Sequence, residues 1–258
     1  MNMKVRKRRP HYWLTSVAVC VLAPLMAFLM VWSDGCSSGS RNPVNSDQLA
    51  ATAGNAPATS ALTNPVNTAG ESVQTSLTYT GEYGESVFEY AKANDWNSAK
   101  LKLEALRKSA KDVSTDVKNQ SDATDSLDEH VAALGIAVAV KDRQTAMREA
   151  NRVTLDVANM STAYKLIVPV EVMRLDYYGR ELEIWTEAKD TDRLKATAHE
   201  MRLEWNALRS SVEAHSAAEA KKFGALVAQL ESAKTTSDYA TDATLVLTEM
   251  DKLEELFR

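Results

Sequence analysis

Apolar residues recur at alternating spacings of three and four along most of the chain after residue 84. The clearest stripes cover residues 96–117, 146–164, 194–212 and 239–257. This spacing keeps one line of apolar side chains on one face of an α-helix, where it can pack lengthwise against a partner helix. Glycine (9) and proline (6) are scarce among the 258 residues. The pattern therefore predicts long, paired helices rather than strands.

An aspartate precedes each stripe at an almost constant interval. Asp95, Asp142, Asp190 and Asp238 are separated by 47, 48 and 48 residues. An aspartate at a helix start accepts backbone N–H bonds and lies favourably at the positive end of the helix dipole. One interval accommodates two helices of about twenty residues and two short connections. The spacing predicts repeated antiparallel helical hairpins with a period of 47–48 residues.

The partner helices of these hairpins are expected at residues 82–93, 127–140, 170–189 and 217–233. Pro169 fits the first turn of the third of them. We therefore predict an all-α fold of about eight helices, arranged as tandem four-helix bundles or as a short helical solenoid. Residues 82–167 would form hairpins 1–2, and residues 168–258 would form hairpins 3–4.

An uncharged apolar segment, residues 14–32, lies near the N-terminus. As a helix it would span roughly 28 Å, which matches the apolar thickness of a bilayer. Five basic residues precede it, namely Lys4, Arg6, Lys7, Arg8 and Arg9. The positive-inside rule then places the N-terminus in the cytoplasm and the rest of the chain outside.

Residues 1–36 can be interpreted in three ways. The first is an uncleaved signal anchor, which the length of the apolar segment favours. The second is a bacterial lipoprotein signal: residues 33–38, with Gly35 before Cys36 and Ser37 after it, resemble a lipobox. The resemblance implies lipid attachment at Cys36, although Ser33 departs from the apolar residue of the family pattern. The third is a cleaved signal, whose apolar core is usually shorter.

Residues 37–81 are rich in Ser, Thr, Ala and Asn and poor in large apolar side chains. Such a composition cannot bury enough surface to offset the entropy of ordering the chain. We therefore predict a disordered stalk with an end-to-end distance of roughly 35–40 Å.

Charge and cysteine content exclude several classes of protein. The whole chain carries −5, and its first ten residues carry +5, so the remainder carries −10. An acidic body argues against nucleic-acid binding and against contact with an anionic membrane surface. The second and last cysteine is Cys36, so the helical region has no disulfide and no thiolate metal site.

Catalytic and metal-binding motifs are also missing from the helical region. His130, His199 and His215 do not fit the Glu-x-x-His pattern of bundle-type iron sites, and His215 suits a role at a helix end. No phosphate loop, nucleophile elbow or zinc motif occurs. The methionines fit core filling better than copper or haem ligation. We therefore expect no catalytic residue, no metal ligand and no cofactor. The methionines in question are Met147, Met160, Met173, Met201 and Met250.

Aromatic and charged residues are most densely mixed in the segment 173–185. Tyr177 and Tyr178 are adjacent, so both cannot point inward, and one hydroxyl should reach a polar partner or a groove. The segment is either a helix packed on two sides with internal ion pairs or a partner-binding surface. The candidate partner surface consists of Arg174, Tyr177, Tyr178, Arg180 and Trp185.

Together these features favour a membrane-tethered, non-catalytic protein of the bacterial cell envelope, on its periplasmic or surface side. Its helical body would bind or scaffold other envelope components, and would not bind nucleic acid. The alternative is a helical bundle that holds a metal ion or haem.

Overall fold

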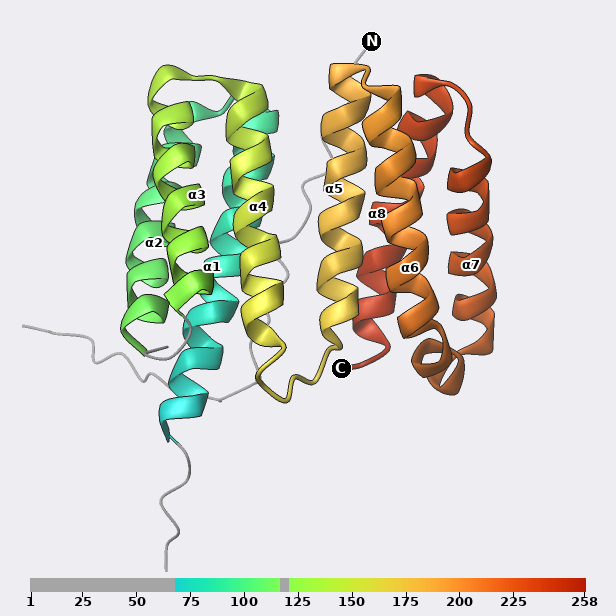
Figure 1. Cartoon of the computed structure of the whole chain (residues 1–258), viewed down its shortest axis with the longest axis horizontal. Helices are drawn as coiled ribbons and strands as arrows, with labels where there is room; N and C mark the ends of the chain where they lie inside the picture. Colours follow the sequence, from blue (N-terminus) through green and yellow to red (C-terminus); the bar gives the residue numbers. More distant parts are fainter. Residues whose placement is uncertain (1–67, 117–120) are drawn as a thin grey trace, which may run out of the picture. The chain divides into compact units, whose positions relative to one another are not determined.

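A computed structural model describes residues 68–116 and 121–258 of the chain (Figure 1). Within these residues the regular structure is entirely α-helical, which confirms the predicted all-α fold. The apolar segment 14–32, Cys36 and residues 37–67 of the predicted stalk lie outside the described residues. The helices are α1 (Thr68–Lys92), α2 (Trp96–Asp116), α3 (Ser121–Val140), α4 (Arg143–Ser161), α5 (Val170–Ala188), α6 (Thr191–His215), α7 (Ala217–Ser232) and α8 (Thr236–Glu255).

The helices contact one another in two closed sets of four. In the first set, α1 packs against α2 and α4, and α3 packs against the same two helices. In the second set, α6 packs against α5 and α7, and α8 packs against the same two helices. The two sets touch through α4 and α5 (Figure 1). This pattern of contacts is the one expected of two four-helix bundles in tandem.

Three of the hairpin turns have the same construction. In each, a left-handed residue with φ near 60° ends one helix, and the following aspartate begins the next. The aspartate's backbone N–H closes the first helix, and its side chain accepts a bond from an N–H in the second. The left-handed residues are Asn94 (φ 57°), Lys141 (φ 60°) and Lys189 (φ 57°). The aspartate oxygens accept at 3.1 Å from Ser98, 3.1 Å from Thr145 and 3.0 Å from Arg193.

The fourth turn is built differently, although Asp238 still accepts backbone N–H bonds at the start of α8, as predicted. Thr235 is the N-cap of α8, and Asp238 lies three residues further on. The Asp238 carboxylate accepts from the backbone N–H of Thr235 at 2.9 Å, while the Thr235 hydroxyl accepts from that of Asp238 at 3.2 Å. This is a capping box, which also explains an acidic residue near a helix start.

The first helix begins at Thr68, well before the predicted residue 82, so residues 68–81 do not belong to a disordered stalk. The stripe in this stretch is hard to detect because small and polar residues interrupt it. Val73 and Leu77 are buried, and the next buried position is Thr80. The Thr80 hydroxyl bonds Ser109 of α2 at 2.8 Å, so it can be buried at little cost.

The remaining predicted helices agree with α3, α5 and α7 to within a few residues, except that α3 begins earlier, at Ser121. The core of the second bundle contains the largest buried side chains, with the Trp205 and Phe223 ring centroids 4.9 Å apart. None of the described helices is both long and apolar enough to cross a membrane.

Candidate functional site

The candidate partner surface lies on α5, a helix with neighbours on several sides. α5 contacts α4, α6 and α8. Arg180 is 4% exposed and Trp185 is 8% exposed, so these two side chains are interior. The prediction of an exposed partner surface is therefore wrong for both of them. The alternative prediction, a helix packed on two sides with internal ion pairs, describes α5 better.

Arg180 connects three helices. Its guanidinium forms an ion pair with Glu85 of α1 at 3.0 Å and another with Asp176, one turn earlier in α5. It also donates to two side chains of α4, at 3.4 Å to Asn151 and 3.3 Å to Thr154. A buried guanidinium needs several acceptors to offset its lost hydration, and these four groups supply them.

A second polar group lies one turn further along α5. The Trp185 indole N–H donates to the Glu181 carboxylate. Asn151 donates to the Tyr177 carbonyl at 3.1 Å and to Glu181 at 3.5 Å. The guanidinium of Arg193 lies 4.8 Å from the Trp185 ring centroid. These bonds continue the Arg180 network and join α4 to α5 along their length.

The other candidate residues lie nearer the surface but also have partners. Arg174 donates to Asn159 of α4 at 3.2 Å and pairs with Glu204 of α6 at 3.8 Å. Tyr177 and Tyr178 meet edge to face, with ring centroids 5.1 Å apart, and both side chains are partly buried. The five residues therefore stabilise contacts between helices and do not form one open surface.

Burial and neighbouring charges shift the pKa values in this network. Burial raises the pKa of Glu85 to about 7. Arg180 lowers this pKa, but burial outweighs it, and the nearby Asp176 and Glu254 add to the rise. Burial lowers the pKa of Arg180, but the carboxylates around it together raise this pKa by more. The net pKa is therefore raised and the guanidinium stays charged. Burial also raises the pKa of Glu181 and of Tyr177. The guanidinium keeps its charge, burial favours the protonated forms of Glu85 and Glu181, and the groups serve as one another's hydrogen-bond partners, which suits a structural role.

His130 and His215 each bond a neighbouring group within the bundles. Within the described residues, no three or more His, Cys, Asp or Glu side chains are grouped to hold a metal ion. His130 of α3 bonds Asp156 of α4 at 2.6 Å, and Ser126 donates to the other oxygen of Asp156 at 3.0 Å. The serine therefore lies on the carboxylate and not on the imidazole, which differs from a nucleophilic triad. His215 bonds the Ser211 carbonyl at 2.9 Å at the end of α6, as expected for a helix-end histidine. Met147, Met160, Met201 and Met250 are buried in the cores, and Met173 is partly buried.

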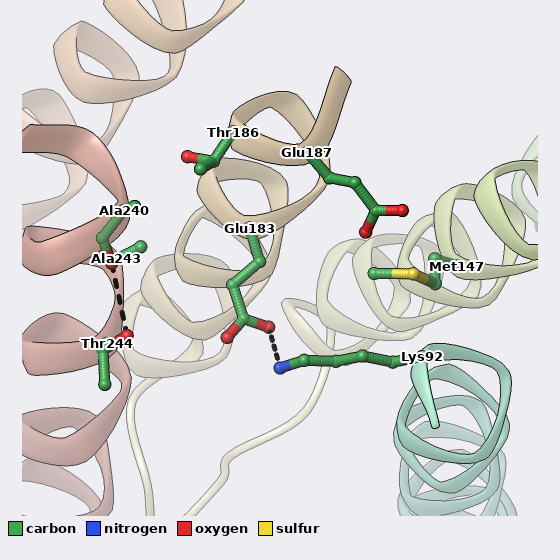
Figure 2. Close-up of a pocket in the computed structure, with 8 residues that line it drawn as sticks. All are labelled: Lys92, Met147, Glu183, Thr186, Glu187, Ala240, Ala243 and Thr244. Atoms are coloured by element: carbon green, nitrogen blue, oxygen red, sulfur yellow. Dashed lines mark hydrogen bonds and ion pairs between the residues drawn. The ribbon is translucent and has the colours of Figure 1, made fainter. Parts of the chain in front are cut away.

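A cavity of about 220 Å³ lies among the ends of α1, α4, α5 and α8 (Figure 2). Lys92 and Glu183 pair across it at 2.6 Å, and Glu187 on its wall pairs with Arg143. Small side chains of α8 form the opposite wall, among them Ala240 and Ala243. Because its charged groups neutralise one another, the cavity offers no unpaired charge to a ligand.

A different surface was not predicted from the sequence. Leu101 of α2 is 74% exposed, and Ile136 and Val140 of α3 are 67% and 69% exposed. Ala132 and Ala139, on the same helix, are also exposed. These five residues are named here the apolar strip. In the sequence, the feature that could have indicated this surface is the run Ile-Ala-Val-Ala-Val at the end of α3. This run is apolar on all sides of the helix and not on one face alone.

Two contacts determine how α2 and α3 align. The Arg107 guanidinium lies over Gly135, and the Ser114 hydroxyl donates to Asp128 at 3.5 Å. Both contacts fit a single antiparallel register. In that register Leu101 is level with Val140 along the bundle, and Ile136 is one turn away.

Comparison with known proteins gives no relative: no family model, no curated protein and no solved structure matches the chain.

Proposed function

We propose that the protein is a membrane-tethered, non-catalytic binding protein that holds other cell-envelope components through its helical body. The observation that carries this proposal is the apolar strip on α2 and α3. Three large aliphatic side chains, Leu101 of α2 and Ile136 and Val140 of α3, are each about two-thirds or more exposed and lie at a similar level along the bundle. Grouped exposed apolar side chains are typical of a surface that another molecule covers.

The body around the strip supports a binding role because it is firmly packed. Buried Leu134 and Val138 of α3 face the core of the first bundle. The outer positions of α3 are therefore held on a rigid support. A partner that docks there would pay little for ordering the protein's own backbone.

The proposed location follows from the N-terminal sequence. The uncharged segment 14–32, with basic residues before it, suits a membrane anchor or a lipoprotein-type signal. Residues 37–67, as part of the predicted stalk, would separate the helices from the membrane, with a mean reach of roughly 30 Å over about thirty residues. A tethered body with that reach could contact partners in the same membrane or in the adjacent envelope layer.

Site-specific photo-crosslinking in intact cells tests this function. A photoreactive amino acid is placed at Ile136 in the full-length chain, and a matched variant carries it at exposed Ala228 of α7. We expect discrete crosslinked products from position 136 that are absent from position 228. Equal crosslinking at both positions, or none at either, would contradict the proposal. Fractionation of the same cells tests the location, since the chain should remain with membranes after washing with high salt.

A further inference from the structure

We infer that the two bundles open and close at the end of their contact that lies farthest from the connection between them, and that two ion pairs hold this end closed. The connection is residues 162–169, which join the end of α4 to the start of α5. It has eight residues, whereas the connections inside each bundle have four residues or fewer. A rotation of one bundle against the other can therefore be absorbed there without breaking a helix.

Two ion pairs, named here the latch, join the bundles at the opposite ends of α4 and α5. Lys92, the last residue of α1, pairs with Glu183 of α5 at 2.6 Å. Arg143, the first residue of α4, pairs with Glu187 near the end of α5. The four side chains are between 18% and 41% exposed, so water and salt ions reach both pairs. Pairs of this kind contribute little net stability, so small changes in their charges can release the latch.

The space beside the latch is incompletely packed. The cavity of about 220 Å³ lies there, between α1 and α4 of the first bundle and α5 and α8 of the second (Figure 2). The walls of a cavity lack the dispersion contacts that would otherwise hold them together. The hydroxyl oxygen of Thr186, on the same wall as Glu183, is buried and has no hydrogen-bond partner among the described residues. A buried hydroxyl without a partner favours an arrangement in which water reaches it.

The contact between the latch and the connection is polar. Arg180 of α5 bonds Asn151 and Thr154 of α4, and Asn151 bonds the Tyr177 carbonyl. Polar groups can exchange such bonds for bonds to water, whereas the apolar cores inside each bundle cannot. Polar contacts between parts of one chain permit relative movement. The closed arrangement remains the more populated one, since Arg180 reaches Glu85 and both α4 side chains only there.

Distances between pairs of spin labels in the full-length chain in detergent test the inference. One pair is placed near the latch, at exposed Gln144 of α4 and exposed Lys195 of α6. A second pair is placed near the connection, at exposed Asp125 of α3 and exposed Ala214 of α6. Each label is attached to an introduced keto amino acid, so the native cysteines stay unchanged.

Pulsed electron paramagnetic resonance measures both distances. We expect the pair near the latch to show a longer distance beside its main one, and the pair near the connection to show one distance. A single distance for the pair near the latch, in the wild type and under every condition below, would overturn the inference.

Charge changes at the latch identify what holds the bundles closed. Glu183→Lys should increase the longer-distance population several-fold, because it places two lysines opposite each other. Lys92→Glu combined with Glu183→Lys restores an opposite-charge pair and should return the population towards that of the wild type. Glu213→Lys, at an exposed pair with Arg209 within α6, is the matched control and should change nothing near the latch. Circular dichroism checks that each variant keeps its helices. An unchanged distribution in Glu183→Lys, or an equal increase in Glu213→Lys, would contradict the inference.

Salt provides a test without a substitution at the latch. Raising sodium chloride from about 0.05 M to about 0.5 M screens exposed ion pairs and should increase the longer-distance population near the latch. The distance between the labels at Asp125 and Ala214 should stay the same. A population near the latch that does not respond to salt would reject the latch. Longer distances for both label pairs would show that the bundles separate or unfold as a whole, and would reject rotation about the connection.

Discussion

Two glycines inside helices should respond to alanine in opposite directions, and the comparison tests the packing of both bundles. At Gly135 of α3 a new Cβ would lie 2.1 Å from Nη2 of Arg107. At Gly179 of α5 it would lie 2.6 Å from Cδ2 of Leu247. In both cases the obstacle is the end of a flexible side chain. The difference is that Arg107 is 46% exposed, whereas Leu247 is 1% exposed.

The expected magnitudes follow from that difference. Replacing glycine by alanine inside a helix gains about 1 kcal/mol, because the unfolded glycine has more freedom to lose. Arg107 can swing into solvent, and its ion pair with Glu104 is an exposed one worth at most about 1 kcal/mol. Gly135→Ala should therefore be neutral or stabilise the first bundle by up to about 1 kcal/mol. Leu247 cannot leave the core, and overpacking costs about 1–3 kcal/mol, so Gly179→Ala should destabilise the second bundle by up to about 2 kcal/mol.

Urea unfolding of the full-length chain in detergent, followed by far-ultraviolet circular dichroism, measures both effects. With a slope of about 2 kcal/mol per molar urea, 1 kcal/mol shifts a midpoint by about 0.5 M. We expect an unchanged or higher midpoint for Gly135→Ala and a lower one for Gly179→Ala. Shifts of the same sign would refute the argument that the freedom of the displaced side chain decides the outcome. Gly179→Ala should lower the midpoint less in a Leu247→Ala background than in the wild type, because the side chain that it crowds has been removed. That difference separates overpacking from a general intolerance of α5 to substitution.

Three further predictions concern charges and caps. Arg180→Ala should destabilise the fold by about 3–5 kcal/mol, because it leaves Glu85 and Asp176 without their buried partner. Arg209→Ala, at an exposed pair with Glu213, is the control and should cost less than about 1 kcal/mol. Thermal unfolding of the two variants measures both effects. The hydrogen bond to Asp156 raises the pKa of His130. The stability that the protonated histidine contributes is therefore fully present below pH 6.5 and is lost as the pH rises through the raised pKa. The melting temperature of the wild type should fall over that pH range, and the melting temperature of His130→Gln should not. Asp142→Ala should cost about 1 kcal/mol through loss of the cap on α4, and retention of the wild-type melting temperature would argue against that cap.

Local patterns in the sequence were enough to predict much of the fold. The three-and-four spacing and the aspartates at Asp95, Asp142 and Asp190 depend on residues within one turn of each other, so they can be recognised without knowing the tertiary structure. The start of α1 was missed for the opposite reason. Its buried Thr80 is acceptable in a core only because Ser109, on the next helix, bonds its hydroxyl.

The candidate surface failed because burial depends on distant partners. Arg180 looks like a surface residue in its own segment. Its burial depends on Glu85, almost a hundred residues earlier, and on Asn151 and Thr154 of α4. No local pattern predicts that α5 would meet a helix of the other bundle. The apolar strip was missed in a similar way: a run that is apolar on all sides predicts burial, but among residues 68–116 and 121–258 no further helix packs on the outer side of α3, so Ile136 is exposed.

These two failures have a common structural cause. A charged guanidinium in an interior contributes little net stability, but it accepts few alternative arrangements of the helices around it. Arg180 and its partners from α1 and α4 therefore specify which side of the first bundle meets α5. Once α1 and α4 are committed to that contact, α2 and α3 are the pair that remains available to other molecules. The buried polar network and the exposed apolar strip are then complementary parts of one arrangement. Loss of Arg180 should impair crosslinking at Ile136 only through loss of the fold, and Arg180→Lys that keeps the helical circular dichroism spectrum should still crosslink there.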